Sequence, residues 1–128
     1  MPHVNDHPIK DENKAHPIAG AWRPTIRAIA GALAEGDWAL SRGIPDVAPL
    51  SADDADRIRR YVAAYGETLT ELSEETWDSS VSQWMETHWE VIVDLWTIES
   101  GRSDLVLSMS VFETGDGFRY EIHSVHVP

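Results

Sequence analysis

The residue types of a hydrolase triad occur together near the C-terminal end of the chain, as Asp94, Ser108 and His123. In the antiparallel pairing that the sequence suggests, they fall in one row across three neighbouring strands. A triad needs its histidine between the serine and the acid, and here the serine is in the middle. A nucleophilic serine also normally sits on a strained, exposed turn and not in mid-strand. The row therefore indicates a polar feature that fixes strand register, and a pocket around Asp94, Trp96, Ser108 and His123 stays as the alternative.

Other pairs of reactive side chains are no better placed for chemistry. Glu90 and Asp94 share a strand face, but at about 3.3 Å per residue they stand roughly 13 Å apart. Glycoside hydrolysis needs its carboxylates about 5–9.5 Å apart. His123 and His126 point to opposite faces of a regular strand, and a bulge near Ser124 that brought them together would still lack a third metal ligand. We therefore expect no catalytic residue, no metal site and no cofactor.

The elements that carry these residues follow from the spacing of apolar positions. Helical spacing predicts helices at about 22–35 and 52–65, and Ser51 followed by Asp54 is typical of a helix N-terminus. From there the period changes to two, which predicts strands at about 81–87, 89–98, 104–113 and 118–127. We expect an α+β fold, with two N-terminal helices packed on one face of a C-terminal antiparallel β-meander of about four strands. Residues 1–20 are expected to form a flexible tail, and residues 21–128 a single domain.

The predicted hairpins assign a face to each strand residue. Pairing Ile98 with Asp104, and Glu113 with Phe118, sets the register of the last three strands. One face then forms the core side, with Val91, Val93, Leu95, Leu105, Leu107, Met109, Val111, Tyr120 and Ile122. The other face mixes apolar and charged groups, namely Glu90, Ile92, Asp94, Trp96, Val106, Ser108, Ser110, Phe112, Arg119, Glu121, His123 and Val125. Such a mixed face is typical of recognition surfaces.

Composition and charge restrict the class of protein. The chain has 128 residues, a net charge of −12 and no cysteine, so disulfides and thiolate metal sites are excluded. The acidic balance argues against nucleic-acid binding. No apolar run is long enough for a membrane span and no signal peptide is visible, which indicates a cytoplasmic protein. Between Tyr61 and Gly101 there is no lysine or arginine, although many carboxylates and four tryptophans lie there.

Several stretches carry a resemblance to a known sequence pattern. They are "ETWDSSVSQWMETHWEVIVDLWTIESGRSDLVLSMSV", the ending "YEIHSVHVP", and the shorter "GDWAL" and "AAYGETL". Over about residues 22 to 128 the chain resembles a small uncharacterised bacterial domain family, which implies no known activity. A looser likeness, resting on size and charge, is to immunity proteins of bacterial toxin systems. Those proteins are small, acidic and α+β, and many inhibit basic nucleases, so this likeness is an analogy at fold level.

These observations favour a non-enzymatic acidic module that binds a basic protein, such as a toxin. We expect Trp77 and Trp96 to anchor the partner. The carboxylates expected to steer and pair with it are Asp78, Glu90, Asp94, Glu99 and Asp104. The alternatives are a small enzyme or ligand-binding domain with the pocket named above, and a structural module that dimerises through an edge strand. The sequence is compatible with a monomer or a homodimer.

Overall fold

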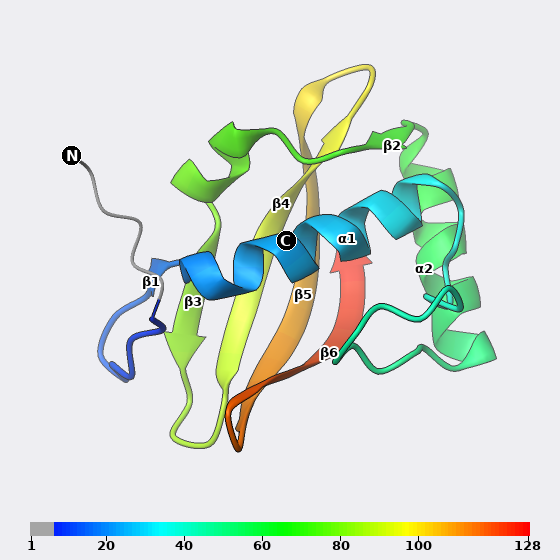
Figure 1. Ribbon diagram of the computed structural model, residues 1–128. Helices are drawn as coiled ribbons and strands as arrows, with labels where there is room; N and C mark the ends of the chain where they lie inside the picture. The colour runs from blue at the N-terminus through cyan, green and yellow to red at the C-terminus, as the bar shows by residue number, and fades with distance from the viewer. Residues whose placement is uncertain (1–6) are drawn as a thin grey trace.

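A six-stranded antiparallel sheet forms the centre of the computed structural model, which describes residues 7–128 (Figure 1). Its main path runs β1-β3-β4-β5-β6, and β2 pairs with β4 beside that path. The strands are β1 (His16–Pro17), β2 (Leu69–Thr70), β3 (Val81–Trp84), β4 (Trp89–Thr97), β5 (Gly101–Thr114) and β6 (Gly117–His126). The expectation of about four strands is therefore wrong. The missing strands, β1 and β2, have two residues each, too few to show an alternating pattern.

The helices begin and end close to their predicted positions. A 3-10 turn, η1 (Gly20–Trp22), leads directly into α1 (Arg23–Ala34), and α2 spans Ala52–Tyr65. Ser51 caps α2 by accepting a hydrogen bond from the backbone N–H of Asp54 at 3.1 Å. Gly66 ends the helix with φ of 85°, a conformation that glycine adopts without strain. Within residues 7–128, neither helix is long and apolar enough to cross a membrane.

The two helices take different places around the sheet, which corrects the expectation that both pack on one face. Helix α1 crosses one face, whereas α2 stands beside β6 at the edge (Figure 1). Arg57 of α2 donates to the carbonyl of His123 at 3.1 Å, and the backbone N–H of Val127 donates to the Tyr61 hydroxyl at 3.2 Å. The stripe of α2 is narrow, since only Ala55, Ile58 and Val62 are buried, and a narrow stripe suits an edge better than a broad face.

The edge of β6 is further occupied by the loop before α2. Tyr120 donates its backbone N–H to Asp46 at 2.9 Å and accepts from Ala48 at 3.1 Å. Together with the bonds from α2, these contacts satisfy backbone groups that a second chain would need for edge pairing. The arrangement disfavours a dimer that forms through β6.

One of the two predicted registers is confirmed. In the β5–β6 hairpin Glu113 faces Phe118 and Met109 faces Ile122, as predicted. In the β4–β5 hairpin the prediction paired Leu95 with Leu107, whereas Val93 faces Leu107, a shift of two residues. Pairing of β4 with β5 continues to Thr97 and Gly101, so the loop between these two strands is shorter than predicted.

The predicted core face survives this shift, because a slip of two residues leaves every side chain on its original face. The residues predicted for that face are all buried: Val91, Val93, Leu95, Leu105, Leu107, Met109, Val111, Tyr120 and Ile122. On the opposite face Val106 and Ser110 are buried as well, and Val125 has changed to the core side. A bulge leaves His123 without a partner in the β5–β6 register, so the alternation reverses and Val125 is buried in the core.

Residues before η1 pack against the sheet. The indole N–H of Trp89 donates to the Ile9 carbonyl at 3.1 Å, and Lys10 forms an ion pair with Glu113 at 2.8 Å. Pro17 pairs with Val81, and the neighbouring Ile18 is 1% exposed in the core. Residues 7–20 of the expected tail thus contribute a strand and core contacts, while residues 1–6 lie outside the described part of the chain.

Candidate protein-binding surface

Asp94 lies on the face of the sheet opposite α1, and it fastens a neighbouring segment to β4. Strands β2 and β3 pair with the two ends of β4 and leave a gap between them at Asp94. The 3-10 turn η2 (Glu74–Asp78) and the residues after it fill this gap. Thr76 donates its hydroxyl to the Asp94 carbonyl at 2.6 Å, and the Asp94 N–H donates to the Ser80 hydroxyl at 3.0 Å. The carboxylate accepts from Ser79 as well, so Asp94 is engaged through its backbone and its side chain.

The row of Asp94, Ser108 and His123 does not form. Asp94 faces Val106, and Ser108 faces Ile92 on one side and Ser124 on the other. His123, displaced by the bulge, contacts Ser110 instead. The expected pocket around Asp94, Trp96, Ser108 and His123 therefore lacks its shared geometry.

A different polar cluster forms on this face around Glu90. The Ser110 hydroxyl donates to the Glu90 carboxylate and also contacts Nε2 of His123. Because the single hydroxyl proton points to Glu90, His123 must donate to Ser110 and cannot act as its base. Ser110 is only 2% exposed, which also removes it from any substrate. The cluster ties three strands together and has the wrong hydrogen-bond order for nucleophilic catalysis.

Histidines flank Glu90 on both sides without completing a metal site. Nε2 of His88 lies 3.4 Å from the Glu90 carboxylate, and Nε2 of His123 lies 3.7 Å from the same oxygen. His126 contacts Ser124 instead, at 2.8 Å. In the part of the chain that the structure describes, no group of three potential ligand residues is arranged to hold a metal ion.

The two tryptophans expected as anchors have different surroundings. Trp77 is 5% exposed, with the guanidinium groups of Arg23 and Arg27 lying 5.1 and 5.4 Å from its ring centre. It extends from η2 and packs against α1, where a partner cannot reach it. Trp96 is half-buried on β4, and its ring lies close to Gly101 across the hairpin. Of the two, Trp96 alone is open to a partner.

The turn η2, strand β2 and the β4–β5 turn lie at one end of the sheet (Figure 1), and several carboxylates belong to these segments or adjoin them in the sequence. We call this region the acidic end and define it by Glu67, Glu71, Glu75, Asp78, Glu99 and Asp104. A hollow of about 420 Å³ opens there, lined by Glu75, Asp78, Trp96, Ser100, Gly101 and Arg102. Within residues 7–128 neither Glu75 nor Asp78 forms an ion pair, and both are exposed. The end therefore carries unneutralised negative charge beside the half-buried indole of Trp96.

Two of these carboxylates brace the β4–β5 turn. Glu99 accepts from both the backbone N–H and the hydroxyl of Thr68, each at 2.8 Å, and these bonds lower the pKa of Glu99. Glu67 accepts from the hydroxyls of Thr97 at 2.6 Å and Ser100 at 2.9 Å. The braced turn holds Ile98 outward, with 70% of its surface exposed.

The exposure of Ile98 was not expected, because the sequence pattern placed it at a paired strand end. The signal that could have marked it is its position directly before the turn residues Glu99, Ser100 and Gly101. Of the predicted partner-binding residues, Asp78, Glu99, Asp104 and Trp96 lie at the acidic end. Glu90 and Asp94 are engaged in the contacts described above, and Trp77 is buried.

Comparison with protein-family models identifies the family of this chain. Neither the curated proteins nor the solved structures contain a significant match to this chain. A family model described as a domain of unknown function, DUF7668, matches residues 30–128, and the chain therefore belongs to that family.

Proposed function

We propose that the domain is a non-enzymatic module that binds a basic protein through the acidic end, and that it acts as an immunity protein against a basic, nuclease-like toxin. The observation that carries the proposal is Ile98, which is 70% exposed among carboxylates. An apolar centre within a charged rim is the usual composition of a protein interface. The toxin class rests on the analogy of size and charge and is the finer part of the proposal.

The distribution of positive charge supports this surface over others. Lys10, Arg57 and Arg119 each neutralise a carboxylate away from the acidic end, whereas Arg27 pairs with Glu74 of η2 beside it. Arg102 is the cation that lines the hollow of the acidic end. A basic partner would thus be drawn toward this end by the field of unpaired carboxylates, and the attraction would weaken as salt screens it.

The geometry gives the competing enzyme hypothesis little support. Its residues, Asp94, Trp96, Ser108 and His123, are spread over different contacts. The Glu90 cluster that forms instead buries its serine. The proposal of a binding module requires none of these residues to react, and it uses side chains that are exposed.

Charge reversal at the acidic end tests the proposal. The test variant carries Glu75→Lys and Asp78→Lys, and the matched control carries Glu12→Lys and Asp116→Lys, which change the net charge equally at exposed sites elsewhere. A partner captured from the native host should bind the wild type and the control but not the test variant. Ile98→Ser should also weaken the complex, because it removes the apolar centre.

Kinetics of the purified partner separate this surface from general charge attraction. The association rate should fall as ionic strength rises, and it should fall less steeply for the test variant. An association rate that is independent of salt, or a complex that both charge variants weaken equally, would contradict the assignment.

The immunity role is tested by a separate experiment. Co-expression with a basic toxin encoded beside this gene should restore growth, and failure to do so would leave the binding surface but reject the role.

A further inference from the structure

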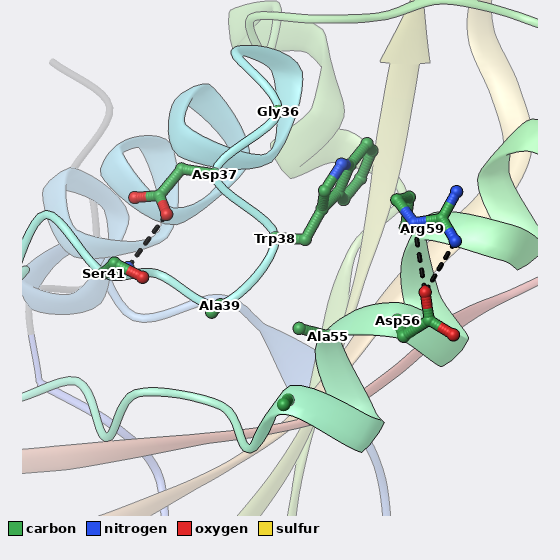
Figure 2. A pocket seen from close by; sticks show the side chains of 9 residues that line it. Gly36, Asp37, Trp38, Ala39, Ser41, Ala55, Asp56 and Arg59 are labelled. Carbon is green, nitrogen blue, oxygen red and sulfur yellow. Dashed lines mark hydrogen bonds and ion pairs between the residues drawn. The ribbon is translucent and has the colours of Figure 1, made fainter.

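A second hollow lies between the loop that follows α1 and the first turns of α2, away from the acidic end (Figure 2). Its volume is about 360 Å³, near the lower limit of small-molecule sites in proteins. The lining residues are Gly36, Asp37, Trp38, Ala39, Ser41, Ala52, Ala55, Asp56 and Arg59. The glycine and alanine residues have small side chains, so a flat molecule can approach the backbone of the hollow closely. The hollow thus has the dimensions of a site for one aromatic ring and a short substituent.

The polar groups around this hollow differ in what they can still bind. Figure 2 shows Trp38 reaching from the loop toward α2, with Asp56 and Arg59 on the facing helix. Asp37 uses one carboxylate oxygen for the N–H of Ser41 at 2.9 Å and the other for Arg42. Asp56 holds Arg59 with one oxygen, at 2.6 Å, and Arg60 with the other, at 3.0 Å. Both carboxylates of the hollow are therefore already engaged.

The guanidinium of Arg59 keeps one donor that is not occupied. Its bonds to Asp56 use Nε and Nη2, so among the described residues Nη1 has no hydrogen-bond partner. A ligand that complements this donor must present an acceptor atom.

Local charge also favours an acceptor that is negative. The ion pairs at the hollow balance Arg42, Arg59 and Arg60 against Glu35, Asp37 and Asp56. The chain as a whole has a net charge of −12, so an anion is repelled less at this rim than over the rest of the acidic surface. Guanidinium groups bind carboxylates with good geometry, and indole rings stack with other flat rings.

We propose that this hollow is a binding site for a small aromatic carboxylate. The ring of the ligand lies against the indole of Trp38 above the floor of small residues. Its carboxylate accepts from Nη1 of Arg59, while Asp56 keeps Nε of Arg59 in place. The site is independent of the acidic end and of the protein partner proposed there.

Three probes with the same ring test the ligand class, namely indole-3-acetate, the neutral indole-3-acetamide and the cationic tryptamine. Saturation-transfer NMR and titration calorimetry on the full chain should give a dissociation constant of about 1 mM or lower for the acetate. The amide and the amine should each bind about tenfold more weakly, since they do not offer a carboxylate to Arg59. Equal binding of all three probes, or no saturable binding of the acetate, would overturn the proposal.

Paired variants locate the site. Arg59→Gln should weaken binding of the acetate about tenfold. Arg60→Gln removes the same charge from the same partner, Asp56, outside the hollow, and should leave the dissociation constant unchanged. Ala52→Leu fills the hollow from an exposed helix position and should abolish binding, whereas Ala63→Leu is its exposed control on the same helix. Equal weakening by both arginine variants, or unchanged binding to Ala52→Leu, would place the ligand elsewhere.

Discussion

Removing the Thr76 hydroxyl should release η2 from the sheet. The Asp94 carbonyl points into the gap between β2 and β3, where Thr76 donates to it at 2.6 Å. Thr76 is 0% exposed, so water cannot replace this bond in the folded protein. Thr76→Val keeps the shape of the side chain and leaves the carbonyl of Asp94 without a donor.

The expected cost follows from that orphaned acceptor. A buried polar group that loses its partner costs about 1–3 kcal/mol, so we expect Thr76→Val to lower the free energy of unfolding by about 2 kcal/mol. For a chain of this length, that loss corresponds to a fall in Tm of roughly 6–12 °C. Thr76→Ser keeps the hydroxyl and removes one methyl group, so its cost should be smaller, about 1 kcal/mol.

Urea denaturation monitored by circular dichroism measures these differences, provided that the m-value is unchanged. Ser79→Ala is the surface control. It removes a bond to the carboxylate of the same Asp94 at an exposed position and should change stability by less than about 0.5 kcal/mol. If Thr76→Ser destabilised the protein more than Thr76→Val, methyl packing rather than the hydrogen bond would hold η2, and the reasoning would fail.

Two further predictions concern stability. Leu107→Ala should lower the free energy of unfolding by about 2–5 kcal/mol because Leu107 is 0% exposed, whereas Ile98→Ala should lower it by less than about 0.5 kcal/mol because Ile98 is 70% exposed. Urea denaturation of both variants measures these losses. A large loss for Ile98→Ala would show that Ile98 belongs to the core, which contradicts the binding assignment. Hydrogen bonds lower the pKa values of Asp37, Asp54 and Glu99. A lowered folded-state pKa stabilises the fold above the unfolded value of about 4 and ceases to do so as pH falls through the folded value, so Tm should drop below about pH 4 and a constant Tm down to about pH 2 would refute it.

Elements with enough residues to repeat their own period could be predicted from the sequence. Helix α2 shows helical spacing through Ile58 and Val62 and carries the cap Ser51, and its bounds are as predicted. The core face of β4 and β5 was also predictable, because side-chain alternation identifies a face even when the register is shifted by two residues. The local sequence pattern determines the face of the sheet on which a side chain lies, and the turn determines which residue it pairs with on the next strand.

Features that depend on contacts between distant segments could not be predicted in this way. Leu69 pairs with Thr97, which lies much further along the chain at the end of β4. The two residues of β2 carry no sequence signal of this pairing. Trp77 was expected to anchor a partner, and therefore to be partly exposed, because it lies among acidic residues in the sequence. It is buried because Arg23 and Arg27, on a helix far away in the sequence, lie over its ring. The acidity of the candidate surface was visible in the sequence, but the individual residues that stay accessible were not.

The carboxylate of Asp94 connects the fold to the candidate function. An acid in the middle of an apolar strand is unfavourable unless its groups are paired, and here the hydroxyls of Thr76, Ser79 and Ser80 meet its carbonyl, its carboxylate and its N–H. Thr76 lies between Glu75 and Asp78, and Ser79 and Ser80 directly follow Asp78. The proposed function therefore gives Asp94 an indirect role, through the position of these two carboxylates. It follows that Asp94→Asn, which keeps an acceptor for Ser79, should leave partner binding nearly intact, while Thr76→Val should weaken it by loosening η2.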